Sequence, residues 1–282
     1  MATKRSKAPK GFSSLRSYWE FRREVASEWR YMWSDAARAF LAELVRESHG
    51  RTSDIPAGAH FFRAQVAHHD VYEPQIDDHL PGPALPARMR PLIGKASDGR
   101  ANPKGIPCLY MASDQHTALA ECRPWIGSLV SIAMFKTLKP LKVVDCTVGV
   151  DKHYLFMNPN APAKMKADAV WSDVGRAFRQ PVTRDDNTAD YAPTQAIAEA
   201  FRREGFDGVV YRSSFGTDRY NLAIFDLDAA KLVMNELHEI KDVEFKFGQS
   251  ANPYYVQSDT NGNEALVRNV ITGFSPIDPE RN

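Results

Sequence analysis

The chain has 282 residues, 43% hydrophobic and 25% charged, so it is long enough to bury a core as one domain plus an extension. Its 36 basic and 35 acidic side chains leave a formal net charge of +1, which argues against a nucleic-acid wrapper and an acidic solvating tail. The 3 cysteines show no CxxC spacing, so neither a disulfide framework nor a zinc knuckle is indicated. A reducing cytoplasm fits best.

The N-terminal segment, residues 1–14, is basic and lacks the apolar run of a signal peptide. No apolar stretch of about 18 residues occurs in the chain, so a membrane span is not expected. We expect a disordered basic tail at 1–14, without direct nucleic-acid binding.

Residues 15–50 are predicted to form a helical extension, because apolar residues recur every three or four positions from 18 to 44. Ser17 and Glu20 have the spacing of a capping box, and positions 34–35 can split the run into two helices. The apolar face of this extension would pack on the chain's own domain, on a second copy or on a partner protein.

The rest of the chain predicts short strands and helices that interleave irregularly. Strands are expected at 60–65, 108–112, 129–135, 141–146, 209–212, 222–225 and 243–247, helices at 114–123, 162–180 and 193–204, and mostly loop at 68–106. Two consecutive strands are joined by only a brief turn, which argues against a doubly wound parallel sheet. We therefore predict an α+β fold with a split, mostly antiparallel sheet flanked by helices.

The segment 99–121 is the most informative part of the chain. Arg100 stands in a turn rich in Gly, Asn and Pro, and such an arginine offers a fixed bidentate donor for phosphate or carboxylate. Glu121 comes two turns into the next helix, where it would face the group that Arg100 holds. A ligand-free turn and a surface glutamate are the structural alternative. The order of residue types favours a site for an anionic substrate.

Four further residues are candidates for the same site. Arg63 follows two phenylalanines at the start of a predicted strand. Tyr110 stands between two apolar residues on another predicted strand, so it faces the opposite side from them. Ser213 and Ser214 follow a strand and open a loop, which suits a sugar or phosphate contact. An edge-strand arginine, a core tyrosine and an ordinary turn are the alternatives. No GxSxG motif surrounds either serine, which argues against a hydrolase nucleophile.

Five segments of the chain occur together in an order typical of one family. They are FFRAQ at 61–65, GRANPKGIPCLYMA at 99–112, TALAE at 117–121, YAPTQAIAEAFRREGFDGVVYRSS at 191–214 and NLAIF at 221–225. These segments resemble the RES domain, a family named for its arginine, glutamate and serine. The expected organisation is a basic tail at 1–14, the helical extension at 15–50, a RES domain at 58–250 and a C-terminal tail at 251–282.

The resemblance implies a fold similar to ADP-ribosyltransferases and a reaction on NAD+ that breaks the bond between nicotinamide and ribose. It also implies the toxin of a toxin–antitoxin pair, with an Xre-type helix-turn-helix antitoxin as partner. By resemblance, the catalytic residues are Glu121, Arg63 and Ser213, and the substrate-binding residues are Arg100, Tyr110, Ser214 and Asn221. The chain departs from the usual family pattern at Ala101, where many members carry an aromatic residue, so a ring contact is expected to be lost there.

We therefore expect a cytoplasmic NAD+ glycohydrolase or NAD+ phosphorylase, with water or inorganic phosphate as acceptor. Glu121 would stabilise the positive charge that develops on the ribose, and Arg63 and Arg100 would hold the pyrophosphate. NAD+ is the substrate, and no cofactor and no metal are expected, since the run at 68–70 lacks ligand spacing. ADP-ribose transfer to a macromolecule and a non-enzymatic binding module are the alternatives. A homo-oligomer is left open.

Overall fold

The computed structural model describes residues 11–154, 160–180, 188–216, 218–249, 254–258 and 262–268. The chain divides into two compact units, Met1–Lys241 and Asp242–Asn282. Most of the expected tail at 1–14 lies outside the described residues. Phe12, which that tail was expected to include, is 5% exposed and packs against Phe40.

The first unit is built on an eight-stranded sheet. In spatial order its strands are β1 (Thr52–Ile55), β7 (Leu141–Asp145), β8 (Gly208–Arg212), β9 (Tyr220–Ile224), β5 (Leu109–Ala112), β2 (His60–Gln65), β6 (Leu129–Thr137) and β10 (Ala230–Glu239). Only β7 and β8 run parallel; the other neighbours are antiparallel. The predicted fold class, α+β with a mostly antiparallel sheet and flanking helices, is confirmed.

Side chains of the central strands alternate between two apolar cores, as the period of two residues along a strand requires. On β8, Val209 and Tyr211 join one core while Val210 joins the other. On β9, Ala223 and its neighbour Leu222 divide in the same way. Both faces of the sheet are therefore covered, and polar side chains on these strands need partners inside the protein.

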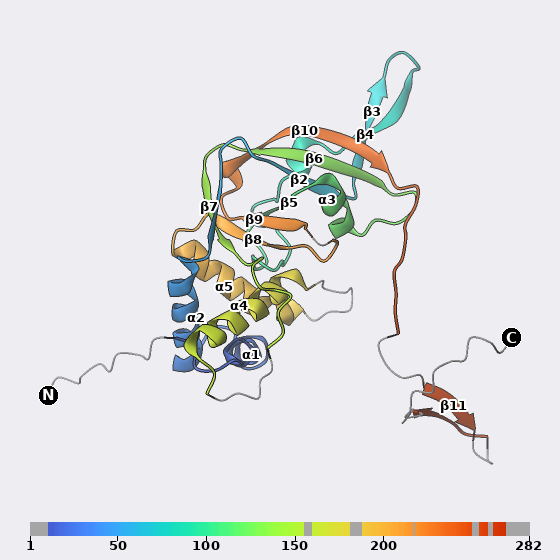
Figure 1. Cartoon of the computed structure of the whole chain (residues 1–282). Coiled ribbons are helices and arrows are strands. Elements are labelled where there is room, and N and C mark those ends of the chain that lie inside the picture. The colour runs from blue at the N-terminus through green and yellow to red at the C-terminus, as the bar shows by residue number, and fades with distance from the viewer. Residues whose placement is uncertain are drawn as a thin grey trace, which may run out of the picture. The chain divides into compact units, whose positions relative to one another are not determined.

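Four helices pack on one face of the sheet, as Figure 1 shows. They are α1 (Ser17–Arg23), α2 (Asp35–Ser48), α4 (Ala163–Arg179) and α5 (Ala192–Arg203). Phe21 and Leu44 of the N-terminal helices share a core with Trp171 of α4 and Phe201 of α5, whose rings stack with centroids 6.3 Å apart. The apolar face of the extension therefore packs on the chain's own domain.

The N-terminal helices are not capped in the way that the sequence predicts. The side chain of Ser17 bonds to Ser14 instead of capping α1, whose N-cap has no side-chain hydrogen bond. One turn of π-helix, Glu24–Glu28, follows α1. Ser34 then caps α2 by accepting a hydrogen bond from the Ala37 N–H at 3.1 Å. The predicted capping box at Ser17 is therefore wrong, and the predicted division of the helical run, with a new helix beginning after Ser34, is confirmed.

The sheet is nearly divided between β2 and β5, which are joined in register by one residue pair, Phe62 and Ala112. By contrast, β2 pairs with β6 over six positions. Helix α3 (Gln115–Cys122) follows β5 directly and packs against β2 at this division. The division leaves room for a cavity between the two halves of the sheet.

Several segments differ from the sequence prediction, among them β1, which forms just before the expected start of the domain. The expected loop at 68–106 contains a hairpin of β3 (His68–Glu73) and β4 (Asp78–Pro83), which projects from the sheet in Figure 1. The strand expected at 243–247 does not form, while β10 forms instead. In the second unit, β11 (Tyr254–Ser258) pairs with β12 (Glu264–Arg268).

Within the described part of the chain, the helices are all too short or too polar to cross a bilayer.

Candidate functional site

A cavity of about 480 Å³ lies where the sheet divides between β2 and β5. Both strands contribute to its wall, together with α3, β8, β9 and the turn at 97–102. The residues that line it include Phe62, Arg63, Ser97, Asp98, Gly99, Arg100, Asn102, Tyr110, Met111, Glu121, Cys122, Arg123, Tyr191, Tyr211 and Asn221. Five of the seven predicted site residues are among them.

Glu121 reaches the cavity because α3 begins at a fixed point. Asp114 is the N-cap, and its carboxylate accepts hydrogen bonds from the Thr117 N–H at 2.8 Å and the Thr117 hydroxyl at 2.6 Å. Burial alone would raise the pKa of Asp114, but the hydrogen bonds from Thr117 and Ser113 outweigh it and lower that pKa. The cap therefore holds an ionised carboxylate at the helix N-terminus, where negative charge is stabilising.

The Glu121 carboxylate is held by two side chains from the other half of the sheet. Ser213 Oγ donates a hydrogen bond to Glu121 Oε1 at 2.9 Å, and Asn221 Nδ2 donates to the same oxygen at 2.6 Å. Ser213 is 1% exposed and Asn221 is 5% exposed. Among the described residues, Glu121 Oε2 has no hydrogen-bond partner, so this oxygen is available to a ligand.

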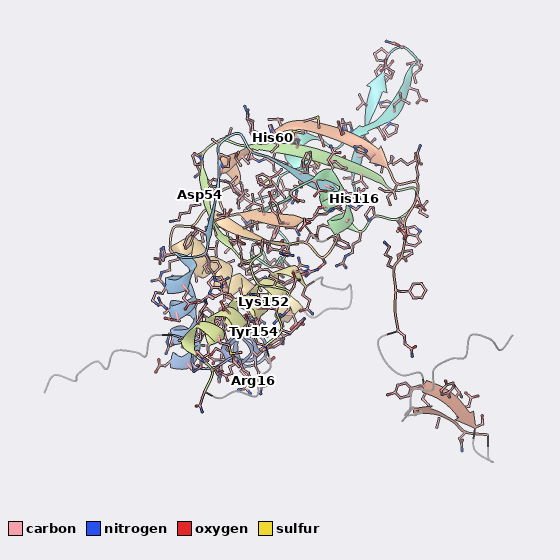
Figure 2. The ribbon with its side chains drawn as sticks, viewed as in Figure 1. Arg16, Asp54, His60, His116, Lys152 and Tyr154 are labelled. Atoms are coloured by element: carbon pink, nitrogen blue, oxygen red, sulfur yellow. The ribbon has the colours of Figure 1, made fainter. Side chains whose placement is uncertain are left out.

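The loop that carries Ser213 is tied to α3. The Ser213 Oγ accepts a hydrogen bond from the Phe215 N–H at 3.1 Å, and Arg219 donates one to His116 on α3, which Figure 2 labels. At the base of the loop, the Ser113 N–H donates to the Tyr220 carbonyl at 3.0 Å. The two partners of Glu121 and the helix that carries it therefore form one connected unit.

Arg63 lies on β2 and reaches across the division of the sheet. Its Nη1 donates to the Tyr110 carbonyl at 3.1 Å, and its buried Nε has no hydrogen-bond partner. Burial lowers the pKa of Arg63, while Cys122 and Tyr110 act in the opposite direction. An arginine side chain stays protonated in proteins, so Arg63 brings a positive charge with unused donors to the cavity.

Arg100 stands on a turn whose backbone is braced from several sides. Gly99 and Asn102 pair with each other, and the Gln195 Nε2 on α5 donates to both of their carbonyls at 3.0 Å. The Tyr110 hydroxyl donates to Asn102 Oδ1 at 2.7 Å and accepts from the Ala101 N–H at 2.8 Å. The turn is therefore rigid before any ligand binds.

The Gly99 position tolerates no side chain. A Cβ there would lie 2.4 Å from the Tyr110 hydroxyl oxygen and 2.7 Å from Asn102 Oδ1. The glycine thus allows the tyrosine to approach the turn closely. Tyr110 lines the cavity, and its hydroxyl bonds to the turn.

The Arg100 guanidinium also has an unused donor, because its buried Nε has no hydrogen-bond partner. Burial raises the pKa of the Tyr211 phenol above its usual value, and the nearby charge of Arg100 opposes that rise. Tyr211 therefore stays neutral beside Arg100. The cavity combines two arginines that have unused donors with one carboxylate that has a free oxygen.

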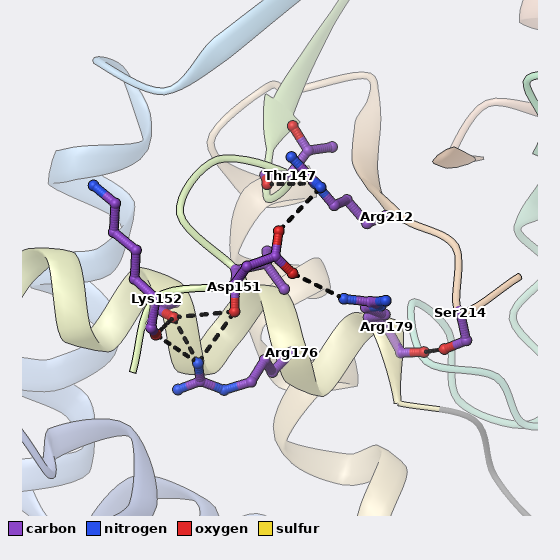
Figure 3. Close-up of polar contacts among 9 residues, drawn as sticks. Thr147, Asp151, Lys152, Arg176, Arg179, Arg212 and Ser214 are labelled. Carbon is purple, nitrogen blue, oxygen red and sulfur yellow. Dashed lines mark hydrogen bonds and ion pairs between the residues drawn. The ribbon is translucent and has the colours of Figure 1, made fainter. Parts of the chain in front are cut away.

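The structure brings most predicted site residues together. Arg63, Arg100, Tyr110, Glu121 and Asn221 line the cavity, and Ser213 contacts it through Glu121. Ser214 is not among the lining residues. Its Oγ donates to the Arg179 carbonyl at 2.8 Å at the end of α4, where Asp151 joins Arg179 to Arg212 (Figure 3). Ser214 therefore ties the loop to α4.

Ala101 does not face the cavity. It is 5% exposed and belongs to the core beneath the helices. A larger ring at this position would enter that core, so the expected loss of a ring contact to the substrate does not follow from the alanine.

Sequence reasoning missed the residues that support the turn and the helix. Asn102 is 3% exposed and donates through Nδ2 to three backbone carbonyls, those of Ser97, Pro103 and Ile106. Asn102 and Gln195 both stand in segments that the family resemblance covers, which was the available signal. Their partners, however, depend on the folded path of the turn.

The run at 68–70 lies on the projecting hairpin, away from the cavity lining. His68 Nε2 and Asp70 Oδ1 are 3.9 Å apart. Among the described residues, no three His, Cys, Asp or Glu side chains are grouped in a way that could hold a metal ion.

The fold and the cavity define a class of protein: an α+β chain with a divided antiparallel sheet and a carboxylate–arginine site at the division. The sequence model of the RES domain matches residues 72–247. Because this match spans more than half of the chain, the protein belongs to the RES domain family. Arg63 precedes the matched region, and the other predicted site residues lie within it.

Among solved structures, the chain is similar to one in the crystal structure of the M. tuberculosis MbcT-MbcA toxin-antitoxin complex. The two are 16% identical with a TM-score of 0.40, and the alignment covers 70% of this chain and 92% of that chain. No curated protein matches the chain.

Proposed function

We propose that the cavity binds NAD+ and breaks the bond between nicotinamide and ribose, with water or inorganic phosphate as acceptor. The observation that carries this proposal is the Glu121 carboxylate, held by Ser213 and Asn221 in a cavity with Arg63 and Arg100. Membership of the RES domain family supports it, because Arg100, Glu121, Ser213 and Asn221 lie within the region that the family model matches. NAD+ is the substrate, and the reaction needs no cofactor or metal.

Cleavage of the bond to nicotinamide does not need a strong general acid, because the leaving group is already cationic. When the bond between C1′ and the pyridinium nitrogen breaks, its electron pair neutralises the ring, and positive charge develops on the ribose. A carboxylate close to that ribose stabilises the charge, as in glycoside hydrolysis. Glu121 supplies this group, and its Oε2 is available to orient the acceptor. With water as acceptor a proton is released; with phosphate the oxygen of the anion forms the new bond.

The two arginines would hold the pyrophosphate. Guanidinium groups present paired donors to phosphate oxygens. Arg63 and Arg100 both line the cavity, so both bring this kind of group to it. Tyr110 would contribute its ring to the wall beside the bound dinucleotide.

We further propose that the protein acts as the toxin of a toxin–antitoxin pair, with an Xre-type helix-turn-helix protein as antitoxin. This role follows from what the RES family implies, because depletion of NAD+ stops growth. Expression of the chain alone should stop bacterial growth and lower cellular NAD+. Normal growth with normal NAD+ would favour a non-enzymatic binding module instead.

The decisive experiment incubates purified protein with NAD+, with and without phosphate, and follows free nicotinamide. Glu121→Gln is the test variant, because it keeps the size of the side chain and removes the charge. We expect nicotinamide release to fall at least about 100-fold with folding unchanged. Wild-type release by this variant would refute the role of Glu121.

Product analysis identifies the acceptor. Free ADP-ribose indicates water, ADP-ribose-1″-phosphate indicates phosphate, and a labelled macromolecule indicates ADP-ribosyl transfer. The last outcome would replace NAD+ degradation by the alternative activity.

A further inference from the structure

A second, smaller cavity of about 190 Å³ lies beside the site and shares part of its wall. Arg63, Ser97, Asn102 and Tyr110 line both cavities. The volume is far larger than one water molecule requires. It is also much smaller than the main cavity, so it suits a small group attached to, or bound beside, a larger ligand.

The charged residues that line this basic recess are all cations: Arg63, Arg88, Arg90 and Lys95. Within the described residues, no aspartate or glutamate lines it. Like charges gathered around a small space repel one another, and water screens the exposed Arg88 and Lys95 more than the half-buried Arg63 and Arg90. An anion in the recess would remove that repulsion.

These cations are poorly neutralised by the protein. In the part of the chain that the structure describes, neither Arg88 nor Lys95 forms an ion pair, and Arg63 bonds only to a backbone carbonyl. The Arg90 guanidinium donates a hydrogen bond to the Leu227 carbonyl and lies 3.1 Å from Asp228, whose side chain is 91% exposed, so water screens this ion pair. Most of the positive charge around the recess is therefore available to a ligand.

The segment that carries three of the cations is anchored. Met89 stands between Arg88 and Arg90, and it is 0% exposed in the second apolar core. Upstream, the Ala84 N–H donates to Ser131 Oγ at 2.8 Å, and Asn235 Nδ2 donates to the Ala84 carbonyl at 2.7 Å. The two arginines are thus held by a buried side chain between them.

We infer that this recess binds a phosphate group next to the main cavity, with Arg63 shared between the two. The inference rests on the proposed function, since it concerns the substrates of the same site. Guanidinium donors favour phosphate because their geometry matches its oxygens. The phosphate is either free inorganic phosphate placed beside the dinucleotide, or a 2′-phosphate on the dinucleotide itself.

The test measures binding by titration calorimetry at constant ionic strength, with Glu121→Gln as the background so that little substrate is consumed during the titration. The probes are inorganic phosphate, NAD+ and its 2′-phosphorylated form, NADP+. The test variant adds Arg88→Gln and Lys95→Gln. The matched control adds Lys104→Gln and Arg203→Gln, which remove the same charge from exposed positions outside the recess.

Loss of one or two charge-assisted hydrogen bonds should weaken phosphate-group binding at least about tenfold in the test variant, with the control unchanged. Weaker binding of inorganic phosphate, with an unchanged NADP+ to NAD+ affinity ratio, supports free phosphate as the ligand. A tenfold loss confined to NADP+ supports the 2′-phosphate.

Equal affinities for all probes in test and control variants would overturn the inference, as would equal losses in both, which indicate only a long-range charge effect. Failure of the proposed function is a separate result. If wild-type protein releases no nicotinamide from NAD+, the enzyme proposal fails, while phosphate binding in the recess is still measured directly.

Discussion

Glu121 has its position from two neighbours, and Ser213 is the more deeply buried of them. Replacing Ser213 by alanine leaves Asn221 as the only donor to Oε1 and lets the carboxylate rotate. Because Ser213 contacts Glu121 and does not line the cavity, we propose that it positions Glu121 instead of touching the substrate. We expect Ser213→Ala to lower kcat by about 10- to 100-fold and to leave KM nearly unchanged.

Ser214→Ala is the matched control for this prediction, since the neighbouring hydroxyl bonds to Arg179 at the end of α4. Steady-state nicotinamide release over a range of NAD+ concentrations separates kcat from KM. Equal losses of kcat in the two variants would show that the loss comes from a disturbed loop and not from the missing bond to Glu121.

Cys122 lines the cavity next to Glu121, and its chemistry is set by burial. Burial raises the pKa of this thiol to about 11, an effect that Arg63 opposes and Glu121 reinforces. At pH 8 roughly one thiol in a thousand is then the reactive thiolate. Alkylation by iodoacetamide, followed by mass spectrometry, should be far slower than that of a cysteine peptide and should accelerate up to about pH 11. Modification at the peptide's rate would contradict this placement.

At the scale of elements, α3 connects its N-cap, Asp114, to the Glu121 carboxylate near its C-terminal end. Asp114→Ala removes the cap bonds to Thr117 and should destabilise the protein by about 1 kcal/mol at pH 7. The pKa of Asp114 is lowered in the folded state, so its contribution is complete above the unfolded pKa of about 4 and is lost as pH falls through the lower folded pKa.

Urea unfolding of wild type and Asp114→Ala at pH 7 and at pH 3 tests this prediction. The difference in unfolding free energy should shrink at the lower pH. A difference that stays constant would mean that the carboxylate does not act as a charged cap.

The sequence predicted those elements whose pattern is local. The strand at 129–135, which became β6, has clear apolar character, and the helix at 162–180 has an amphipathic face; both formed nearly as expected. The strand β10 was missed because it depends on pairing with β6, and alternation at 243–247 without a neighbour made no strand. In the site, the types and order of the residues were enough to predict Arg100 and Glu121 as candidates. The bond from Gln195 to Gly99 could not be predicted in this way, because the two residues are 96 positions apart in the chain.

At the scale of the whole molecule, the N-terminal helices are part of the core rather than an appendage. Leu44 is 0% exposed and Phe21 is 2% exposed, in the same core as Val170 and Phe201 of α4 and α5. Helix α5 also carries Gln195, which braces the arginine turn. The extension therefore packs against the helix, α5, whose Gln195 holds the turn of Arg100.

Two changes of different severity test this coupling. Deletion of residues 1–49 would expose the large apolar surface beneath α1 and α2, and we expect the remainder to aggregate.

The point variant Leu44→Ala leaves a cavity in the same core and should lower the free energy of unfolding by about 2–5 kcal/mol, measured in urea. Met32→Ala is the control, because Met32 is 79% exposed and its loss should change stability by less than about 0.5 kcal/mol. A soluble, monomeric and fully active deletion variant would instead assign this apolar face to a partner protein.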